Sequence, residues 1–271
     1  MVSFVLASAL MLATASQPCA ALAKAPLADE SHLQWKGKKV AIFGDSISDK
    51  NVKKWRHWWR YLEDLTGIEA LVYARNGWQW SGIPKQADTL LEEKADPDAI
   101  MILMGTNDFN SSVPLGVWWQ VVSETVNRNG KEVVCKKRVL DYSKKTVRGR
   151  INIAMKLLKE RYPGRQIILL TPLHRGFFRG GETNVQPDEA YANPLGLWID
   201  DYAQVVREAS SIWSVPVIDL FAESGLLPSL PEYGKYFNNA ETDLLHPGSE
   251  GCRRIATAIA ARMSSIPATF R

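Results

Sequence analysis

The stretch VAIFGDSIS, residues 40–48, joins an apolar run to a short polar turn. Its first four residues are apolar without interruption, which is typical of a parallel strand that is covered on both faces. Glycine, aspartate and two serines then follow within five residues. Polar groups directly behind such a strand lie at the carboxyl edge of a sheet, where α/β proteins bind their ligands.

Similar apolar runs recur along the chain, and amphipathic stretches with helical spacing separate them. We expect strands over residues 40–43, 70–73, 99–104, 166–170 and 215–220. We expect helices over residues 55–65, 147–158, 195–210 and 249–263. This alternation of strands and helices predicts an α/β protein with a doubly wound, mainly parallel sheet.

Charge is distributed unevenly, because all 33 Lys and Arg residues and all 29 Asp and Glu residues follow residue 23. The uncharged start is apolar up to Ala15 and ends in the small-residue pattern of residues 21–23, which predicts a cleaved signal peptide over residues 1–23. The protein is then expected to be secreted or periplasmic, with residues 24–271 as one domain. A lipid anchor at Cys19 is the weaker alternative, because Ser16 stands where such sites usually carry an aliphatic residue.

The rest of the composition excludes several classes of protein. The net charge of +4 is mild and the basic groups are short and scattered, which indicates a solvated surface and not a nucleic-acid track. No metal-binding spacing is present, so we expect no metal. We also expect no organic cofactor, and no stable membrane insertion once the signal is removed. Without Cys19, two cysteines remain, and whether Cys135 and Cys252 pair stays open.

Two segments, residues 109–142 and 174–192, are longer than ordinary loops. The first contains Asn129-Gly130 between residues 124–128 and 131–134, which predicts a hairpin with a type I′ turn. Each segment begins at the carboxyl end of an expected strand. Both are therefore candidates for the wall of a site at that edge.

Polar motifs follow the expected strands at this same edge. Gly44-Asp45-Ser46-Ile47-Ser48 follows the first strand, Arg75-Asn76-Gly77 the second, and Gly105-Thr106-Asn107-Asp108 the third. Asp243-Leu244-Leu245-His246 comes after the fifth strand, just before the last helix. A serine, a glycine, an asparagine and an Asp-x-x-His pair are the groups that acyl transfer through a serine nucleophile requires.

This set of motifs resembles the SGNH (GDSL-type) hydrolase family from Gly44 to the last helix. GDSIS is similar to the family's first block, GTND to its third and DLLH to its last, in the same order. The resemblance implies ester hydrolysis on a three-layer α/β/α, flavodoxin-like fold with a five-stranded sheet. The second block is less distinct: Asn76-Gly77 fits best, and Ser81-Gly82 is a rival in the same loop.

Each motif residue has an expected chemical role. Ser46 is the candidate nucleophile and needs a base, which His246 supplies because its ordinary pKa is near neutrality. Asp243 is expected to orient the imidazole. The backbone N–H groups of Ser46 and Gly77 and the side-chain amide of Asn107 are the candidate oxyanion hole. Helix capping or loop support are the alternative roles for these side chains.

Several other residues are candidates near the site. Asp45 is expected to fix the nucleophile turn more than to take part in the chemistry. His174 ends the fourth strand and serves either the loop or the substrate. The remaining candidates for substrate contact are three tryptophans with flat faces that suit sugar rings or acyl chains: Trp78, Trp80 and Trp118.

These observations favour a secreted serine esterase that removes short acyl groups, such as acetyl, from carbohydrate through an acyl-enzyme on Ser46. A lipase, lysophospholipase or thioesterase with the same site is the alternative within the enzymes. A carbohydrate-binding protein on a degenerate hydrolase fold is the alternative from another class. The intact Ser, Asn, Asp and His set argues against that last reading.

Overall fold

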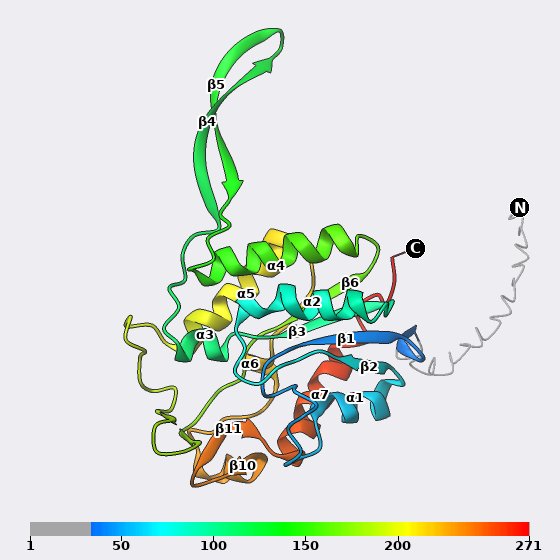
Figure 1. The fold of residues 1–271 in the computed structure, drawn as a ribbon, viewed down its shortest axis with the longest axis vertical. Helices are drawn as coiled ribbons and strands as arrows, with labels where there is room; N and C mark the ends of the chain where they lie inside the picture. Colours follow the sequence, from blue (N-terminus) through cyan, green and yellow to red (C-terminus); the bar gives the residue numbers. More distant parts are fainter. Residues whose placement is uncertain (1–33, 271) are drawn as a thin grey trace, which may run out of the picture. The chain divides into compact units, whose positions relative to one another are not determined.

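The computed structural model describes residues 34–270, so the expected signal peptide and Cys19 lie outside the described residues. Its centre is a five-stranded, all-parallel sheet with the strand order β2-β1-β3-β6-β9 (Figure 1). These strands are β1 (Lys39–Gly44), β2 (Glu69–Val72), β3 (Ala99–Leu103), β6 (Gln166–Leu170) and β9 (Val217–Ile218). The expected α/β fold with a doubly wound parallel sheet is confirmed.

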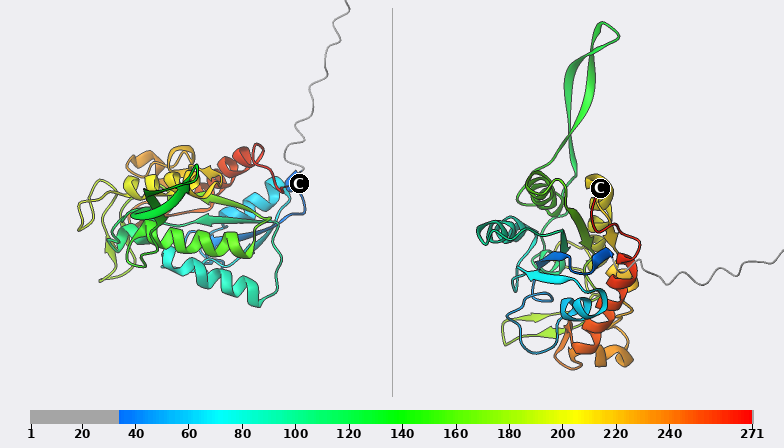
Figure 2. Two further views of the ribbon diagram at one scale, coloured as in Figure 1. Left: turned by 90° about the horizontal axis from the view of Figure 1, so that it is seen from above. Right: turned by 90° about the vertical axis from the view of Figure 1, so that its right-hand side faces the viewer.

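Helices cover both faces of this sheet and form the outer two of three layers (Figure 2). One face packs against α1 (Trp58–Thr66) and α7 (Ser249–Met263), and the other against α2 (Ile83–Glu92), α4 (Val147–Arg161) and α5 (Ile199–Trp213). Every residue of β3 and β6 is buried, which explains their uninterrupted apolar runs. The short helices are α3 (Thr106–Asn110) and α6 (Leu220–Glu223).

Some element bounds differ from those expected. The helix α1 begins at Trp58, so Trp55 lies in the preceding loop. The helix α5 begins at Ile199, because the side chain of Asn193 accepts hydrogen bonds from the backbone N–H groups of Leu195 and Leu197 and holds a turn there. The strand β9 ends early, since Asp219 caps the following helix through the N–H of Ala222.

The hairpin predicted at Asn129-Gly130 is present and is much longer than expected. Its strands β4 (Trp119–Arg128) and β5 (Lys131–Leu140) pair only with each other, and Figure 1 shows them extending away from the sheet. Asn129 and Gly130 have φ values of 54° and 79°, as a type I′ turn requires. Because the hairpin leaves the sheet, residues 109–142 contribute only Asn110 and Ser111 to the catalytic pocket described below.

A second sheet, which the sequence analysis did not predict, lies beside the main one. It is a four-stranded antiparallel sheet in the order β10-β11-β7-β8. Its strands are β7 (Phe178–Arg179), β8 (Val185–Gln186), β10 (Phe237–Asn239) and β11 (Asp243–Pro247). The DLLH motif therefore lies on a strand of this small sheet and not on a loop of the main one. The strands of the small sheet are too short to show a periodic pattern in the sequence.

The cysteines and the helices complete the description. Cys135, on β5, and Cys252, buried in α7, form no disulfide bond with each other, and within residues 34–270 both are free thiols. Within residues 34–270, no helix is long and apolar enough to cross a membrane. In the same part of the chain, no group of three His, Cys, Asp or Glu side chains is placed to hold a metal ion.

Candidate active site

Ser46 lies in a tight turn at the carboxyl end of β1, and its side chain opens into a cavity. The side chain of Asp45 accepts a hydrogen bond from the N–H of Ile47 at 3.1 Å, and its carbonyl accepts one from Ser48 at 3.1 Å. A glycine is required at position 44, because a Cβ there would lie 2.7 Å from the carbonyl oxygen of Leu103. The turn therefore holds Ser46 directly behind the strand, as the sequence analysis expected.

His246 connects the small sheet to this turn. Its Nε2 lies 3.0 Å from Oγ of Ser46, and its Nδ1 lies 2.9 Å from Oδ1 of Asp243. The same Oδ1 accepts the backbone N–H of His246, and Oδ2 accepts an N–H from the side chain of Asn238 at 2.8 Å. In this arrangement Nδ1 donates to the carboxylate, which leaves the lone pair of Nε2 for the serine hydroxyl.

The charge state of Asp243 suits this arrangement. Burial by itself raises the pKa of this carboxyl, but hydrogen bonds from His246 and Asn238 outweigh burial and hold the pKa below its usual value. Asp243 is therefore ionised near neutrality. A fixed negative charge beside Nδ1 stabilises the imidazolium that forms when Nε2 takes a proton.

Two aromatic side chains hold the imidazole, and the sequence analysis assigned a site role to neither. Trp55 stacks on His246 with ring centres 5.7 Å apart and an angle of 28°. Phe178, from β7, packs edge-on at 5.1 Å. Trp55 was counted with the helix that follows. Its position in the loop before α1, which only the structure reveals, lets it reach the histidine.

Three donors are available around the serine hydroxyl. Among the described residues, the backbone N–H groups of Ser46 and Gly77 have no acceptor, and both residues line the cavity. Asn107 also lines it, and one N–H of its amide donates to the carbonyl of Trp78 at 3.0 Å, which orients the group. Because all three residues line the cavity into which Ser46 opens, their N–H groups remain the candidate donors of an oxyanion hole.

The rival glycine, Gly82, has a different structural role. Its N–H donates to the carbonyl of Gln79 at 2.8 Å, and it does not line the catalytic cavity. A Cβ at this position would lie 2.5 Å from the ring of Trp78, so packing accounts for the glycine. Gly77 has a φ of 73° with open space beside it. The geometry favours Gly77 as the second donor.

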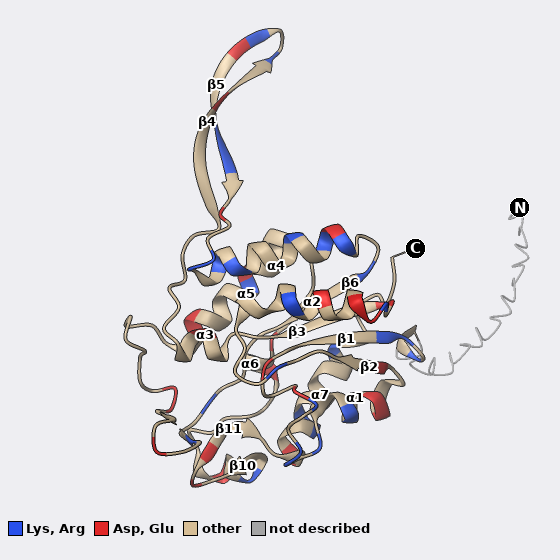
Figure 3. Ribbon diagram, viewed as in Figure 1, with Lys and Arg blue, Asp and Glu red and all other residues tan. Residues whose placement is uncertain are grey.

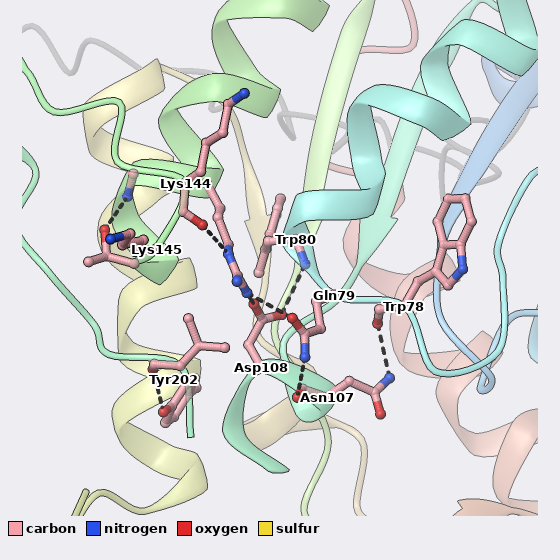
Figure 4. A network of polar contacts seen from close by, with 12 residues as sticks. Trp78, Gln79, Trp80, Asn107, Asp108, Lys144, Lys145 and Tyr202 are labelled. Carbon is pink, nitrogen blue, oxygen red and sulfur yellow. Dashed lines mark hydrogen bonds and ion pairs between the residues drawn. The ribbon is translucent and has the colours of Figure 1, made fainter. Parts of the chain in front are cut away.

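A buried polar network lies next to Asn107 and holds it in place (Figure 4). Asp108 has no exposed surface, pairs with Arg150 at 2.8 Å and accepts the N–H of Trp80 at 3.0 Å. Gln79 accepts from Arg150 at 2.9 Å and donates to the carbonyl of Asn107 at 3.3 Å. Burial raises the pKa of Asp108 to about 6, although Arg150 opposes the shift. Asp108 therefore ties the helix α3, which carries Asn107, to the segment that follows Gly77.

The catalytic pocket has a volume of about 660 Å³ and a mostly polar wall. Segment 174–192 was expected to wall the site, and it does so through Phe178, Arg179, Gly180, Asn184 and Gln186. Two cations without a carboxylate partner among the described residues, Lys54 and Arg179, also line it. The wall thus offers many hydrogen-bonding groups and little apolar surface.

None of the three tryptophans expected at the site lines the catalytic pocket. Trp80 has no exposed surface and belongs to the core beneath α2, so the expectation that it contacts substrate is corrected. Trp118 packs against the same core, and its Nε1 donates to Glu208 at 2.8 Å, away from the pocket. Trp78 lines a separate cavity of about 320 Å³ together with Gly77 and Gly82. All three rings therefore pack against the same core, outside the lining of the catalytic pocket.

The remaining candidates support the loops and do not line the catalytic pocket. His174 bonds Glu189 through Nδ1 at 2.8 Å and packs on Phe221 with ring centres 3.8 Å apart. Asp45 is 1% exposed and bonds within the nucleophile turn. For Asp45 this is the structural role that the sequence analysis preferred, and for His174 it is the loop role of the two that were left open.

An Asp–His–Ser arrangement at the carboxyl edge of a parallel sheet is the geometry of a serine hydrolase on an α/β fold. The model of the GDSL-like Lipase/Acylhydrolase family matches residues 42–254. The chain belongs to this family and is a carboxylic-ester hydrolase, which confirms the resemblance seen in its motifs. A comparison with curated proteins finds no match.

Solved structures share the fold at low sequence identity. A possible lipase from Chitinophaga pinensis is 21% identical with a TM-score of 0.65, covering 84% of this chain and 98% of its own. A protein from Lactobacillus plantarum is 21% identical with a TM-score of 0.64, covering 85% and 98%. A catalytic mutant of an acetylxylan esterase from Geobacillus stearothermophilus is 19% identical with a TM-score of 0.53, covering 87% and 98%.

Replacing Asn107 by alanine is expected to lower kcat/KM for p-nitrophenyl acetate by about 10²–10³-fold, the usual cost of losing one oxyanion donor. The loss should appear in kcat, because the substrate oxygen that accepts this hydrogen bond becomes negatively charged only in the transition state. Steady-state kinetics measures it. Asn127→Ala, on the strand β4 and outside the catalytic pocket, is the matched control, and an equal loss in both variants contradicts the assignment.

The pH dependence of stability is expected to change in Asp45→Asn. Burial raises the pKa of Asp45 from 3.8 to about 7, so the folded protein keeps a proton that the unfolded chain releases within this range. Wild-type stability therefore falls as the pH rises through this window, and the neutral amide removes that loss. Relative to wild type, Asp45→Asn should gain on the order of 3 kcal/mol in unfolding free energy between pH 4 and pH 8.

Urea unfolding at several pH values measures this difference. Asp96→Asn, which changes an exposed carboxyl, serves as the control and should show no such gain. A difference between Asp45→Asn and wild type that stays constant with pH contradicts the prediction.

Proposed function

We propose that this protein is an exported serine esterase that removes short acyl groups, acetyl above all, from carbohydrate. The observation that carries the proposal is the chain of contacts from Asp243 through His246 to Ser46, with distances of 2.9 Å and 3.0 Å. The same contacts support a covalent route. A serine hydroxyl in contact with a histidine base is the arrangement that activates it as a nucleophile.

The reaction proceeds in two halves. Oγ of Ser46 attacks the ester carbonyl while Nε2 of His246 takes its proton, and the three donors around Ser46 stabilise the oxyanion. The imidazolium then gives this proton to the leaving alkoxide, which departs as the alcohol and leaves the acyl group on Ser46. Water, deprotonated by the same Nε2, attacks the acyl-enzyme, and the imidazolium then returns this proton to Oγ of Ser46 as the acid leaves.

The pocket wall supports a short acyl group on a sugar. Beside Ser46 it carries amide and hydroxyl groups that match sugar hydroxyls, including Asn76, Asn184, Asn238 and Thr242. A long acyl chain needs an extended apolar surface, and this wall offers chiefly Trp55, Phe178 and Leu245. The acetylxylan esterase among the structural neighbours acts on a substrate of the proposed kind.

Export is proposed from the uncharged residues 1–23 with their small-residue end, which lie outside the described residues. Expression of the full chain in a bacterial host, followed by mass spectrometry of the extracellular or periplasmic protein, tests it. A mature N-terminus at Lys24 is expected. Full-length protein confined to the cytoplasm contradicts this part of the proposal.

Substrate choice is tested with p-nitrophenyl acetate, butyrate and palmitate, and with acetylated xylan. The highest kcat/KM is expected for the acetate, together with release of acetic acid from the polysaccharide. Chemically deacetylated xylan is the control for background acid. An optimum at palmitate assigns the protein to the lipases instead, and binding of sugars without turnover of any ester assigns it a non-catalytic role.

A further inference from the structure

A second cavity of about 560 Å³ lies next to the catalytic pocket. It is bounded by the loop of residues 50–57, the helix α1 and the edge strand β2. The two cavities share Val52 and Trp55, the residue that stacks on the catalytic histidine. The two cavities are therefore neighbours along the loop that carries these two residues.

The wall of the second cavity carries an excess of positive charge. It contains Lys50, Lys53, Arg56 and Arg60 against a single carboxylate, Glu93. Figure 3 shows basic residues on the loop before α1 and on the helix itself. We call this cavity the lysine cleft, after Lys50 and Lys53.

The lysines differ from the arginines in how their charges are balanced. Arg56 pairs with Asp64 at 2.5 Å, and Arg60 pairs with Glu63 at 3.0 Å. Within residues 34–270, neither lysine of the cleft has a carboxylate partner, and the ammonium of Lys53 donates only to the carbonyl of Lys50. These two charges are thus available to an anionic ligand.

The loop that presents the lysines is held in place. His57 is 6% exposed, and its Nε2 bonds the carbonyl of Val52 at 2.7 Å. Its ring stacks on Trp59 with centres 5.3 Å apart and an angle of 8°. Because the loop is anchored at both Val52 and His57, the backbone that carries Lys53 is held before a ligand arrives, which reduces the entropic cost of binding.

We propose that the lysine cleft binds an anionic sugar unit, so that the substrate is an acylated acidic glycan. The acyl group would lie at Ser46, the chain would pass Trp55, and the carboxylate of a neighbouring uronic acid would meet Lys50 and Lys53. Lys54 and Arg179, on the wall of the catalytic pocket, extend the positive field along the same path. This proposal rests on the esterase function proposed above and adds the charge of the substrate.

Calorimetric titration of the wild-type protein with an unacylated oligogalacturonate tests the proposal without any turnover. Saturable binding is expected that weakens between 20 and 200 mM salt, because exposed charges are screened. Lys50→Gln/Lys53→Gln should weaken binding about tenfold, which corresponds to about 1.4 kcal/mol. Lys131→Gln/Lys136→Gln, on the hairpin β4–β5, makes the same change in charge elsewhere and should bind like wild type.

Further ligands identify the chemistry that is recognised. A sulfated oligosaccharide that binds in the same lysine-dependent way extends the anion from carboxylate to sulfate and supports the cleft. A neutral xylo-oligosaccharide that binds as tightly as the acidic one overturns the role of charge. Polyglutamate that binds as tightly overturns the role of the sugar, and equal losses in both double variants overturn the location.

The two proposals fail separately. Hydrolysis of p-nitrophenyl acetate by the wild-type protein reports on the esterase, and oligogalacturonate binding reports on the cleft. Turnover without lysine-dependent binding overturns the cleft alone. Binding without turnover of any ester leaves the cleft in place and overturns the proposed esterase.

Discussion

Ser46→Ala is expected to lower kcat for p-nitrophenyl acetate by about 10⁶-fold, the scale of losing a serine nucleophile that works with a histidine base. The methyl group has no lone pair to attack the carbonyl, so the covalent route closes while the oxyanion donors remain. Spectrophotometric assay at enzyme concentrations high enough to detect the residual rate measures the loss.

The structure offers controls for this variant. Ser81→Ala changes an exposed serine outside the catalytic pocket and should keep full activity. Ser46→Ala/His246→Ala should be no slower than Ser46→Ala alone, since the two groups act as one unit. A Ser46→Ala protein that keeps a tenth of the activity, or losses in the double variant that multiply, excludes Ser46 as the nucleophile.

Asp243→Asn is expected to cost about 10⁴-fold in kcat near neutral pH, the scale seen when the carboxylate of such a triad becomes an amide. The amide keeps the shape of the side chain but removes the charge that stabilises the imidazolium. Its N–H₂ also favours the tautomer with the proton on Nε2, which then cannot accept the proton of Ser46. Measurement of kcat between pH 5 and pH 9 tests this.

Asn238→Ala is the matched control for Asp243→Asn, because it removes one hydrogen bond to the carboxylate and leaves its charge. A much smaller loss in kcat is expected for Asn238→Ala than for Asp243→Asn. Activity of Asp243→Asn within tenfold of wild type shows that the carboxylate only supports the strand β11.

Local patterns were sufficient to predict the main sheet and the motif residues. The uninterrupted apolar runs of β1, β3 and β6 reflect burial on both faces. A strand that is buried in this way can be predicted from its own residues. The turn at Asn129-Gly130 could be predicted in the same way, because a positive φ at two successive positions favours those residue types.

The surroundings of the motif residues were not predictable in this way. The strand β11 pairs with β7 through Asp243 and Phe178, far apart in the sequence, and strands of two residues carry no periodic signal. Trp80 and Trp55 carry the same side chain, yet one is fully buried in the core and the other stacks on His246. Composition alone does not distinguish these two positions.

By itself, then, the sequence determined the parallel α/β sheet and the residues Ser46, Asn107, Asp243 and His246 as one candidate set. The tertiary structure decided what surrounds them: the small antiparallel sheet that carries Asp243 and His246, Trp55 against the imidazole, and a cationic cleft beside the pocket. The reason is physical. Strand burial and turn geometry depend on neighbours along the chain, whereas a pocket is made by segments that only packing brings together.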